Sequence, residues 1–174
     1  MNRRNLLKSG ILALVTAGKG QVFDQKTSTS QTPEEYTNIC LCEHWISDYW
    51  GTDYTPQSIE KFCDSKIKQS TLSDKVISGR PALHEWMTDF RKRFEVKAIK
   101  LESNSFAVGN SVVSAWAMVL KKKESGFGVA IIPDSNDTYT LSGMFLHKIE
   151  QEKIVEEHVF LSIPSGRLSM NLNF

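Results

Sequence analysis

The sequence predicts an α+β fold in which one curved antiparallel sheet wraps against three N-terminal helices. Three observations support this prediction. Apolar residues recur with a period near 3.6 in the first half of the chain and near 2 in the second half. Turn-forming clusters separate the strand-like segments. A length of 174 residues with 40% hydrophobic content suits one domain with a buried core. Helices followed by strands are typical of the α+β class.

The first predicted helix spans residues 32–50. Thr32 is suited to the N-cap, Pro33 to the first helical position, and Glu35 completes a capping box. The residues at helical spacing form one predicted apolar stripe: Tyr36, Ile39, Cys42, Ile46 and Tyr49.

Two more helices are predicted before the sheet begins. Residues 55–67 open with a second Thr-Pro pair, and residues 79–94 follow. The buried side of the second helix is predicted to hold Ile59, Phe62 and Cys63, and that of the third to hold Leu83, Trp86, Phe90 and Phe94. Trp45, Trp50 and Trp86 are expected to pack the helices against the sheet.

The strand-like segments are rich in β-branched and aromatic residues. They cover residues 96–103, 110–123, 126–133, 138–150 and 153–163. Residues 133–137 and the pair Gln151-Glu152 are predicted to be hairpin connections.

The N-terminal residues differ from the rest of the chain. The segment Asn2-Arg3-Arg4-Asn5-Leu6-Leu7-Lys8 resembles a twin-arginine export signal, and the apolar run 11–15 is far too short to span a bilayer. The resemblance implies a signal peptide over residues 1–20 and a periplasmic or extracellular location. The alternative is a basic N-terminal arm. The predicted organisation continues with a polar linker at 21–31, a domain at 32–163 and a tail at 164–174.

The charge balance argues against some partners. The formal net charge is +1, and without residues 1–20 the chain has 17 basic and 20 acidic residues. A mildly acidic domain is not expected to bind nucleic acid or an anionic membrane surface. No stable membrane span is predicted for the mature chain.

The three cysteines leave two alternatives open. Cys40 and Cys42 lie two residues apart on a helix and so point to different sides. Cys63 could bridge to one of them in an oxidising compartment. The alternative is that all three are small buried residues. Their spacing does not suggest a zinc site.

This succession of helices and strands resembles the SnoaL-like polyketide cyclase branch of the nuclear transport factor two-like superfamily. The similarity covers roughly residues 33–163. It depends on the opening helix, the 79–94 element, and the succession Ser142-Gly143, Lys148 and Lys153-Ile154-Val155-Glu156. The resemblance implies a cone whose sheet and helices enclose a pocket for a small, largely apolar ligand. It also implies homodimerisation through the convex sheet face, and no metal or organic cofactor.

Cyclases of this family use a His and an Asp on the last two strands. By the resemblance, these positions fall on Phe145 and Ser162 in this sequence. Neither side chain can transfer a proton in the same way.

Strand alternation suggests other residues that could take the role of the family's His and Asp. A turn at residues 151–152 places Phe145 and His147 on one face with Glu156, His158, Phe160 and Ser162, and puts His147 opposite Glu156. A one-residue slip would send the set to the other face. The catalytic candidates are His158, His147 and Glu156; the ligand-binding candidates are Trp116, Phe145, Phe160 and Ser162. The alternative for His147 and Glu156 is a charge pair at the sheet rim. For Trp116, the roles of pocket wall and of ligand binder both stay open.

Two functions follow from these residues. The first is proton transfer on a carbonyl compound, as in cyclisation or isomerisation, because a carboxylate beside an imidazole tunes the imidazole for acid–base work. The second is a non-catalytic ligand-binding or dimerisation module that kept the cone but lost the family's His/Asp pair.

Overall fold

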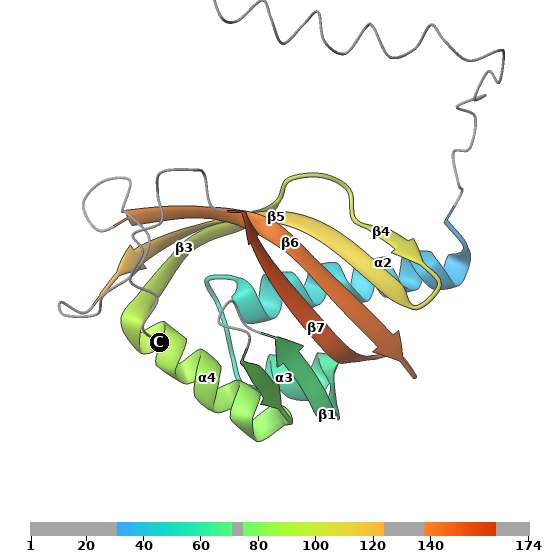
Figure 1. Cartoon of the computed structure of the whole chain (residues 1–174), viewed down its shortest axis with the longest axis horizontal. Coiled ribbons are helices and arrows are strands. Elements are labelled where there is room, and N and C mark those ends of the chain that lie inside the picture. Colours follow the sequence, from blue (N-terminus) through green and yellow to red (C-terminus); the bar gives the residue numbers. More distant parts are fainter. Residues whose placement is uncertain (1–30, 71–74, 124–137, 163–174) are drawn as a thin grey trace, which may run out of the picture. The chain divides into compact units, whose positions relative to one another are not determined.

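The computed structural model describes residues 31–70, 75–123 and 138–162. The helical elements are α2 (Pro33–Trp45), the π-helix η2 (Ile46–Trp50), α3 (Gln57–Phe62) and α4 (Arg80–Arg93). The strands are β1 (Cys63–Ser70), β2 (Val76–Ser78), β3 (Phe94–Leu101), β4 (Phe106–Val108), β5 (Ser111–Lys122), β6 (Thr138–Glu150) and β7 (Lys153–Ser162). The predicted α+β class and curved sheet are confirmed (Figure 1).

Helix α2 begins at the predicted N-cap. The Thr32 hydroxyl accepts a hydrogen bond from the Glu35 amide at 3.2 Å, and the Glu35 carboxylate accepts one from the Thr32 amide at 2.8 Å. Both bonds satisfy amides that lack a partner within the helix. Most of the predicted apolar stripe is buried, but Tyr36 is 64% exposed because the first turn lies at the rim of the domain.

The second predicted helix is only partly correct. Helix α3 ends at Phe62, and Cys63 starts β1 instead of continuing the helix. The segment after Cys63 alternates between exposed and buried side chains, as a half-buried strand does. The short strands β1 and β2 therefore interrupt the predicted run of helices.

The sheet has the strand order β2-β1-β7-β6-β5-β3, with β4 also paired to β5. All pairings but one are antiparallel, as predicted. The exception is β1, which runs parallel to β7 and makes the sheet mixed. The predicted strand 126–133 and turn 133–137 lie outside the described residues.

The sheet curves over the helices and buries its concave face against them. Figure 1 shows β5 and β6 arching above α2, with α4 leading into β3 at the other end. Among the largest fully buried side chains on this side are Trp45, Tyr49, Phe145, Ile59 and Ile67. The three cysteines are free thiols, and Cys42 and Cys63 are buried.

The β6–β7 hairpin has an irregular register. Its turn lies at Gln151 and Glu152, as predicted, and both have positive φ angles of 50° and 58°. Ile149 pairs with Ile154, but Lys148 pairs with Glu156. Val155 is therefore an extra residue in β7, a β-bulge that reverses which face the following side chains occupy.

Candidate functional site

The bulge changes the partner of His147. His147 lies opposite Glu157 on the concave face, and its Nε2 is 3.0 Å from Glu157 Oε2. The predicted pairing of His147 with Glu156 is wrong, because that prediction assumed unbroken alternation along β7. His147 is 0% and Glu157 1% exposed, so this imidazole–carboxylate pair is enclosed by the protein.

Four side chains donate hydrogen bonds to the Glu157 carboxylate. His147 and the Trp45 indole donate to Oε2. The Gln69 amide donates to Oε1 at 2.6 Å, and the Trp50 indole to the same atom at 3.3 Å. These donors come from α2, η2, β1 and β6, and Glu157 itself lies on β7. One carboxylate therefore links two helical elements to three strands. A π-helix often marks a functional position, and here η2 carries Trp50 toward Glu157.

The surroundings favour the ionised form of the pair. Burial acts to raise the pKa of Glu157, but the hydrogen bond and charge of His147, with the other donors, bring it below its usual value. Burial acts to lower the pKa of His147, but Cys42 and Glu157 outweigh it and raise that pKa. Glu157 is therefore a carboxylate and His147 an imidazolium at neutral pH.

Among the described residues, the Trp116 Nε1 donor is buried near this pair and has no hydrogen-bond partner. Tyr49 Oη, Gln69 Oε1 and His147 Nδ1 are buried polar atoms as well. Tyr49 lies beside Gln69 and His147 beside Cys42, and these neighbours shift the pKa values of Tyr49 and His147. Unpaired buried donors are uncommon in protein cores.

Aromatic side chains fill the space beside the pair. Phe145 stacks on Trp50 with a centroid distance of 5.5 Å and on Trp116 at 5.1 Å. Its own exposure is 0%. Phe145 and Trp116 thus line the interior, as predicted for ligand-binding candidates, but here they contact other protein side chains.

The remaining predicted site residues lie on the opposite, outer face of the sheet. Glu156, His158, Phe160 and Ser162 pair with Lys148, Leu146, Met144 and Ser142 of β6. His158 is 43% exposed; its Nδ1 lies 3.0 Å from the Ser70 hydroxyl, and its Nε2 lies 3.7 Å from a Glu156 oxygen. The predicted placement of these four residues on the His147 face is wrong for the same reason as the register. Whether they act in catalysis or binding stays a prediction.

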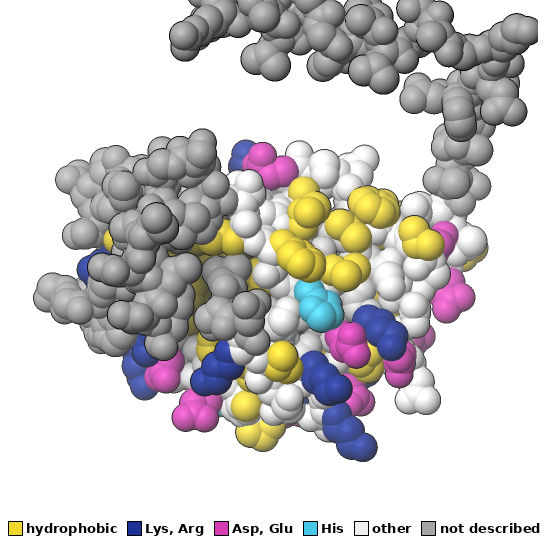
Figure 2. Space-filling model, viewed as in Figure 1, with side chains coloured by type: hydrophobic (Ala, Val, Ile, Leu, Met, Phe, Trp, Pro, Cys, Tyr) yellow, Lys and Arg dark blue, Asp and Glu magenta, His cyan; other side chains and the backbone are white. Residues whose placement is uncertain are grey.

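The outer face around these residues is apolar. Phe106 is 52%, Val108 72%, Met144 49% and Phe160 50% exposed. Cross-strand pairing continues this surface through Val113, Ala115 and Leu146. We call these seven residues the outer apolar face. Figure 2 shows hydrophobic side chains gathered over β5, β6 and β7, with a histidine at their border.

Two surface hollows are formed by described residues. One, of about 420 Å³, lies between the loop after η2 and β3. The other, of about 410 Å³, lies where α3 meets the start of α4 and includes His84. Neither includes His147 or Glu157. Within the described ranges no group of His, Cys, Asp and Glu is placed to hold a metal ion, and no helix there is long and apolar enough to cross a membrane.

Sequence reasoning missed Glu157, Gln69 and the polar role of Trp45 and Trp50. The signal for Glu157 was its position within Glu156-Glu157-His158, where either carboxylate could face inward. Only the bulge decides between them, and a bulge next to a two-residue turn has no clear sequence mark here.

Comparisons with known proteins agree on the fold. A protein from Jannaschia sp. CCS1, described as a SnoaL-like polyketide cyclase, superposes with a TM-score of 0.61 at 15% identity over 76% of this chain and 90% of its own. An epoxide hydrolase from M. tuberculosis of the LEH-like type gives 0.57 at 10% identity, over 75% of this chain and 86% of its own.

A third structure is a hypothetical protein with a ketosteroid isomerase-like fold from Catenulispora acidiphila DSM 44928, in complex with trimethylamine. It gives a TM-score of 0.56 at 12% identity, over 71% of this chain and 85% of its own. No protein-family model and no curated protein matches the chain. The chain therefore shares the α+β fold of SnoaL-like cyclases and ketosteroid isomerase-like proteins.

Proposed function

We propose that this chain is a SnoaL-like binding domain that pairs with a second copy of itself through the outer apolar face. The observation that carries the proposal is the exposure of Phe106, Val108, Met144 and Phe160 on one continuous sheet surface. Contiguous apolar patches of this kind mark interaction sites on soluble proteins. A symmetric pairing would place the same residues of both copies against each other.

The filled interior favours the dimerisation role over a cyclase role. Phe145, Trp50 and Trp116 pack against one another in the space beside Glu157, and Glu157 already accepts four hydrogen bonds. A substrate would have to displace these side chains and compete for a carboxylate with satisfied partners.

Sedimentation of the full chain tests the proposal. We expect the wild type to form a dimer, and the doubly substituted Met144→Lys, Phe160→Lys variant to be monomeric, because two like charges would be placed within the apolar contact. Tyr36→Lys is the control, since Tyr36 is an exposed aromatic residue on α2. A monomeric wild type, or a dimer that persists in the double variant, would contradict the proposal.

A second candidate is proton transfer at His147 and Glu157, favoured by their burial, their ionised state and the unpaired Trp116 indole. An unpaired N–H donor in an enclosed interior is suited to an oxyanion that forms during enolisation of a carbonyl compound. Access would require the stacked aromatic side chains to move.

Hydrogen–deuterium exchange next to the carbonyl group of 2-tetralone, followed by NMR, tests this candidate. We expect catalysed exchange to be lost in His147→Gln and kept in Glu156→Gln, with folding of both checked by circular dichroism. Equal exchange rates with and without the protein would rule the candidate out for this class of substrate.

We also propose that residues 1–20 direct export to the periplasm or beyond. The twin arginines, the following apolar pair and Lys8 support it. Fusion of residues 1–31 to a folded fluorescent reporter tests the proposal. Replacing Arg3 and Arg4 by Lys should retain the reporter in the cytoplasm, and a reporter that is never exported would contradict the proposal.

A further inference from the structure

The surface hollow of about 420 Å³ lies along an edge of the sheet. Strand β3 is the last strand in the order of the described sheet, and its free edge faces the loop that follows η2. The hollow, of about 420 Å³, is lined by Thr52, Tyr54, Arg91, Phe94, Glu95, Val96, Lys97 and Lys123. We call it the β3 cleft. This volume is in the range of sites for small molecules.

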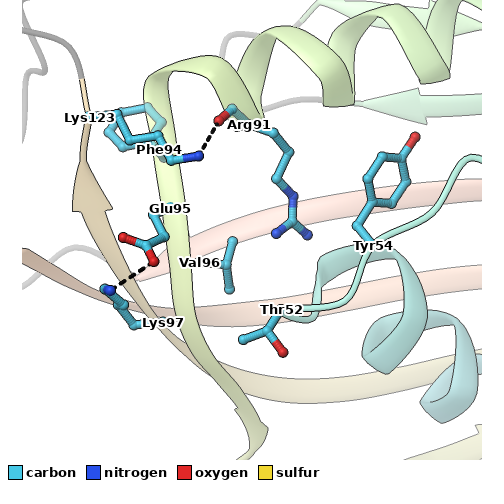
Figure 3. Close-up of a pocket in the computed structure, with 8 residues that line it drawn as sticks. All are labelled: Thr52, Tyr54, Arg91, Phe94, Glu95, Val96, Lys97 and Lys123. Carbon is cyan, nitrogen blue, oxygen red and sulfur yellow. Dashed lines mark hydrogen bonds and ion pairs between the residues drawn. The ribbon is translucent and has the colours of Figure 1, made fainter.

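Arg91 is the central polar side chain of the β3 cleft. Figure 3 shows its guanidinium between Val96 of β3 and the loop residues Thr52 and Tyr54. Its Nη2 donates to the Tyr49 carbonyl at 3.0 Å and to the Gly51 carbonyl at 2.6 Å, and its Nε lies 3.4 Å from Met87 Sδ. The guanidinium lies 5.4 Å from the centre of the Tyr54 ring.

The charge of Arg91 is not neutralised by a described carboxylate. None of the ion pairs between described residues includes it, although the side chain is partly buried. Partial burial lowers its pKa, and the groups that act in the opposite direction are the Tyr54 and Tyr49 side chains. A partly desolvated cation of this kind is normally paired with an anion.

The rest of the β3 cleft adds positive charge. Lys97 and Lys123 both line it, and its one acidic residue, Glu95, is held by Lys97 at 2.8 Å. Lys123 donates its own hydrogen bond to the Arg91 carbonyl, so its charge stays at the cleft. Three cations and one carboxylate leave the site with a positive excess in a domain that is otherwise mildly acidic.

We propose that the β3 cleft binds a small organic anion, with its carboxylate or phosphate group against Arg91 and its apolar body against Tyr54 and Phe94. The guanidinium keeps Nη1 outside the hydrogen bonds to Tyr49 and Gly51. Arginine is suited to such recognition because it stays charged when partly buried, and the N–H groups of Nη1 can donate charge-assisted hydrogen bonds to a carboxylate or phosphate oxygen. The aromatic rings supply an apolar wall for the rest of the ligand.

Part of this arrangement also has a structural role. Arg91, Lys92 and Arg93 form the last turn of α4, where positive charge is favourable beside the helix C-terminus. That role requires charge near the helix end; it does not require Arg91 to reach the loop at residues 49–51 or to lie beside Tyr54. The hydrogen bonds from Nη2 hold the side chain in the cleft, and Nη1, which takes part in neither of them, is the donor that points to a ligand.

NMR titration of the full-length protein with benzoate, phenyl phosphate and neutral benzamide tests the proposal. We expect saturable shifts at Thr52, Tyr54 and Val96 with at least one anion, with a Kd of roughly 0.1–1 mM, and none with benzamide. Tighter binding of benzoate or of phenyl phosphate identifies the acidic group. Absence of a shift at these residues with both anions, or equal binding of benzamide, would overturn the proposal.

Two variants separate binding from folding. Arg91→Gln should weaken anion binding by roughly tenfold to a hundredfold, the effect of losing a charged hydrogen bond. Since Arg91 also contacts the Tyr49 and Gly51 carbonyls, Lys97→Gln provides a second test in an exposed residue, with an expected loss of roughly twofold to fivefold. Lys66→Gln, on β1 and outside the cleft, is the matched control and should bind as the wild type. Unchanged affinity in both cleft variants would overturn the proposal.

Discussion

His147 and Glu157 form the ion pair at the centre of the domain, with 3.0 Å between Nε2 and Oε2. The neighbouring Glu156 faces the other side of the sheet, where it pairs with Lys148 across the strands. Two adjacent glutamates thus have very different surroundings, although their side chains are chemically identical.

Substituting these two glutamates should lower the stability of the protein by very different amounts. Glu157→Gln should lower the free energy of unfolding by about 3–5 kcal/mol, because it removes the charge that faces a buried imidazolium and leaves donors without their acceptor. Glu156→Gln should change it by no more than about 0.5 kcal/mol, since that carboxylate is partly exposed. Urea unfolding followed by fluorescence measures both. Similar losses in the two variants would show that Glu157 is not the residue buried in the folded state.

The ion pair also predicts how stability depends on pH. Folding raises the pKa of His147 above its ordinary value of 6.5. The stabilisation it provides is therefore complete below pH 6.5 and is lost as pH rises from there toward the folded pKa. In that window the folded state holds one more proton than the unfolded state, and the free energy of unfolding should fall by about 1.4 kcal/mol per pH unit.

His147→Gln should remove this slope, and His44→Gln, a change at an exposed histidine on α2, should leave it in place.

At acid pH the slope of stability against pH has the opposite sign. The pKa of Glu157 is lowered by folding, so its contribution is present above the ordinary value of 4.5 and is lost as pH falls below it. Urea midpoints measured across the pH range check both limbs. A wild-type slope that persists in His147→Gln would assign it to another group.

Two interior tryptophans offer a matched comparison. Trp45→Phe removes an indole donor to Glu157, whereas Trp116→Phe removes an indole N–H that has no partner among the described residues. Both rings are stacked on a neighbour, Trp45 on Tyr49 and Trp116 on Phe145. Trp45→Phe should therefore be the more destabilising change, by about 1–3 kcal/mol, the cost of an unmet bond to a charged group. Thermal unfolding of the two variants side by side measures the difference, and equal losses would argue against a special role for the Trp45 bond.

Gly143 should not tolerate a side chain. A Cβ at this position would collide with the carbonyl oxygen of Phe160 and would lie 2.9 Å from Trp116 Cζ2. Gly143→Ala should therefore destabilise the protein by at least about 1–3 kcal/mol, the usual cost of overpacking. Gly109→Ala is the comparison: there φ is +60°, which favours glycine, but nothing lies within 4 Å of the added atom, and a loss of about 1 kcal/mol is expected. Calorimetry measures the loss of stability in both variants. A larger loss for Gly109→Ala than for Gly143→Ala would contradict the prediction.

The sequence was sufficient for the elements whose signals are local. The capping box at Thr32 and Glu35 fixes where α2 begins, and the alternating residues of β5 and β6 fix which side chains face inward. Local sequence signals were not sufficient where the pairing of distant strands determines the structure. Cys63 follows an apolar helical pattern, yet it lies on β1 because that segment completes the sheet beside β7. The face of Glu157 depends on one extra residue, Val155, whose effect appears only once the hairpin has paired.

The candidate site was predictable only in part for the same reason. His147, Phe145 and Trp116 were assigned to the interior from β5 and β6, where alternation is regular. His158, Phe160 and Ser162 come after the bulge in β7 and lie on the outer face. The contribution of Gln69 required knowledge of the parallel β1–β7 contact, which joins residues 88 positions apart.

The parallel pairing of β1 with β7 also constrains how the chain can fold during synthesis. The helices and β1 emerge from the ribosome early, but the strand on which β1 docks is the last of the domain to be made. Contacts with such large sequence separation are slow to form, because the intervening chain must be ordered first. Until β7 is complete, Gln69 and the indoles of Trp45 and Trp50 have no carboxylate to bind. Assembly of this domain must therefore wait for β7, and a nascent chain that stalls before residue 157 would expose the apolar side of α2 to chaperones.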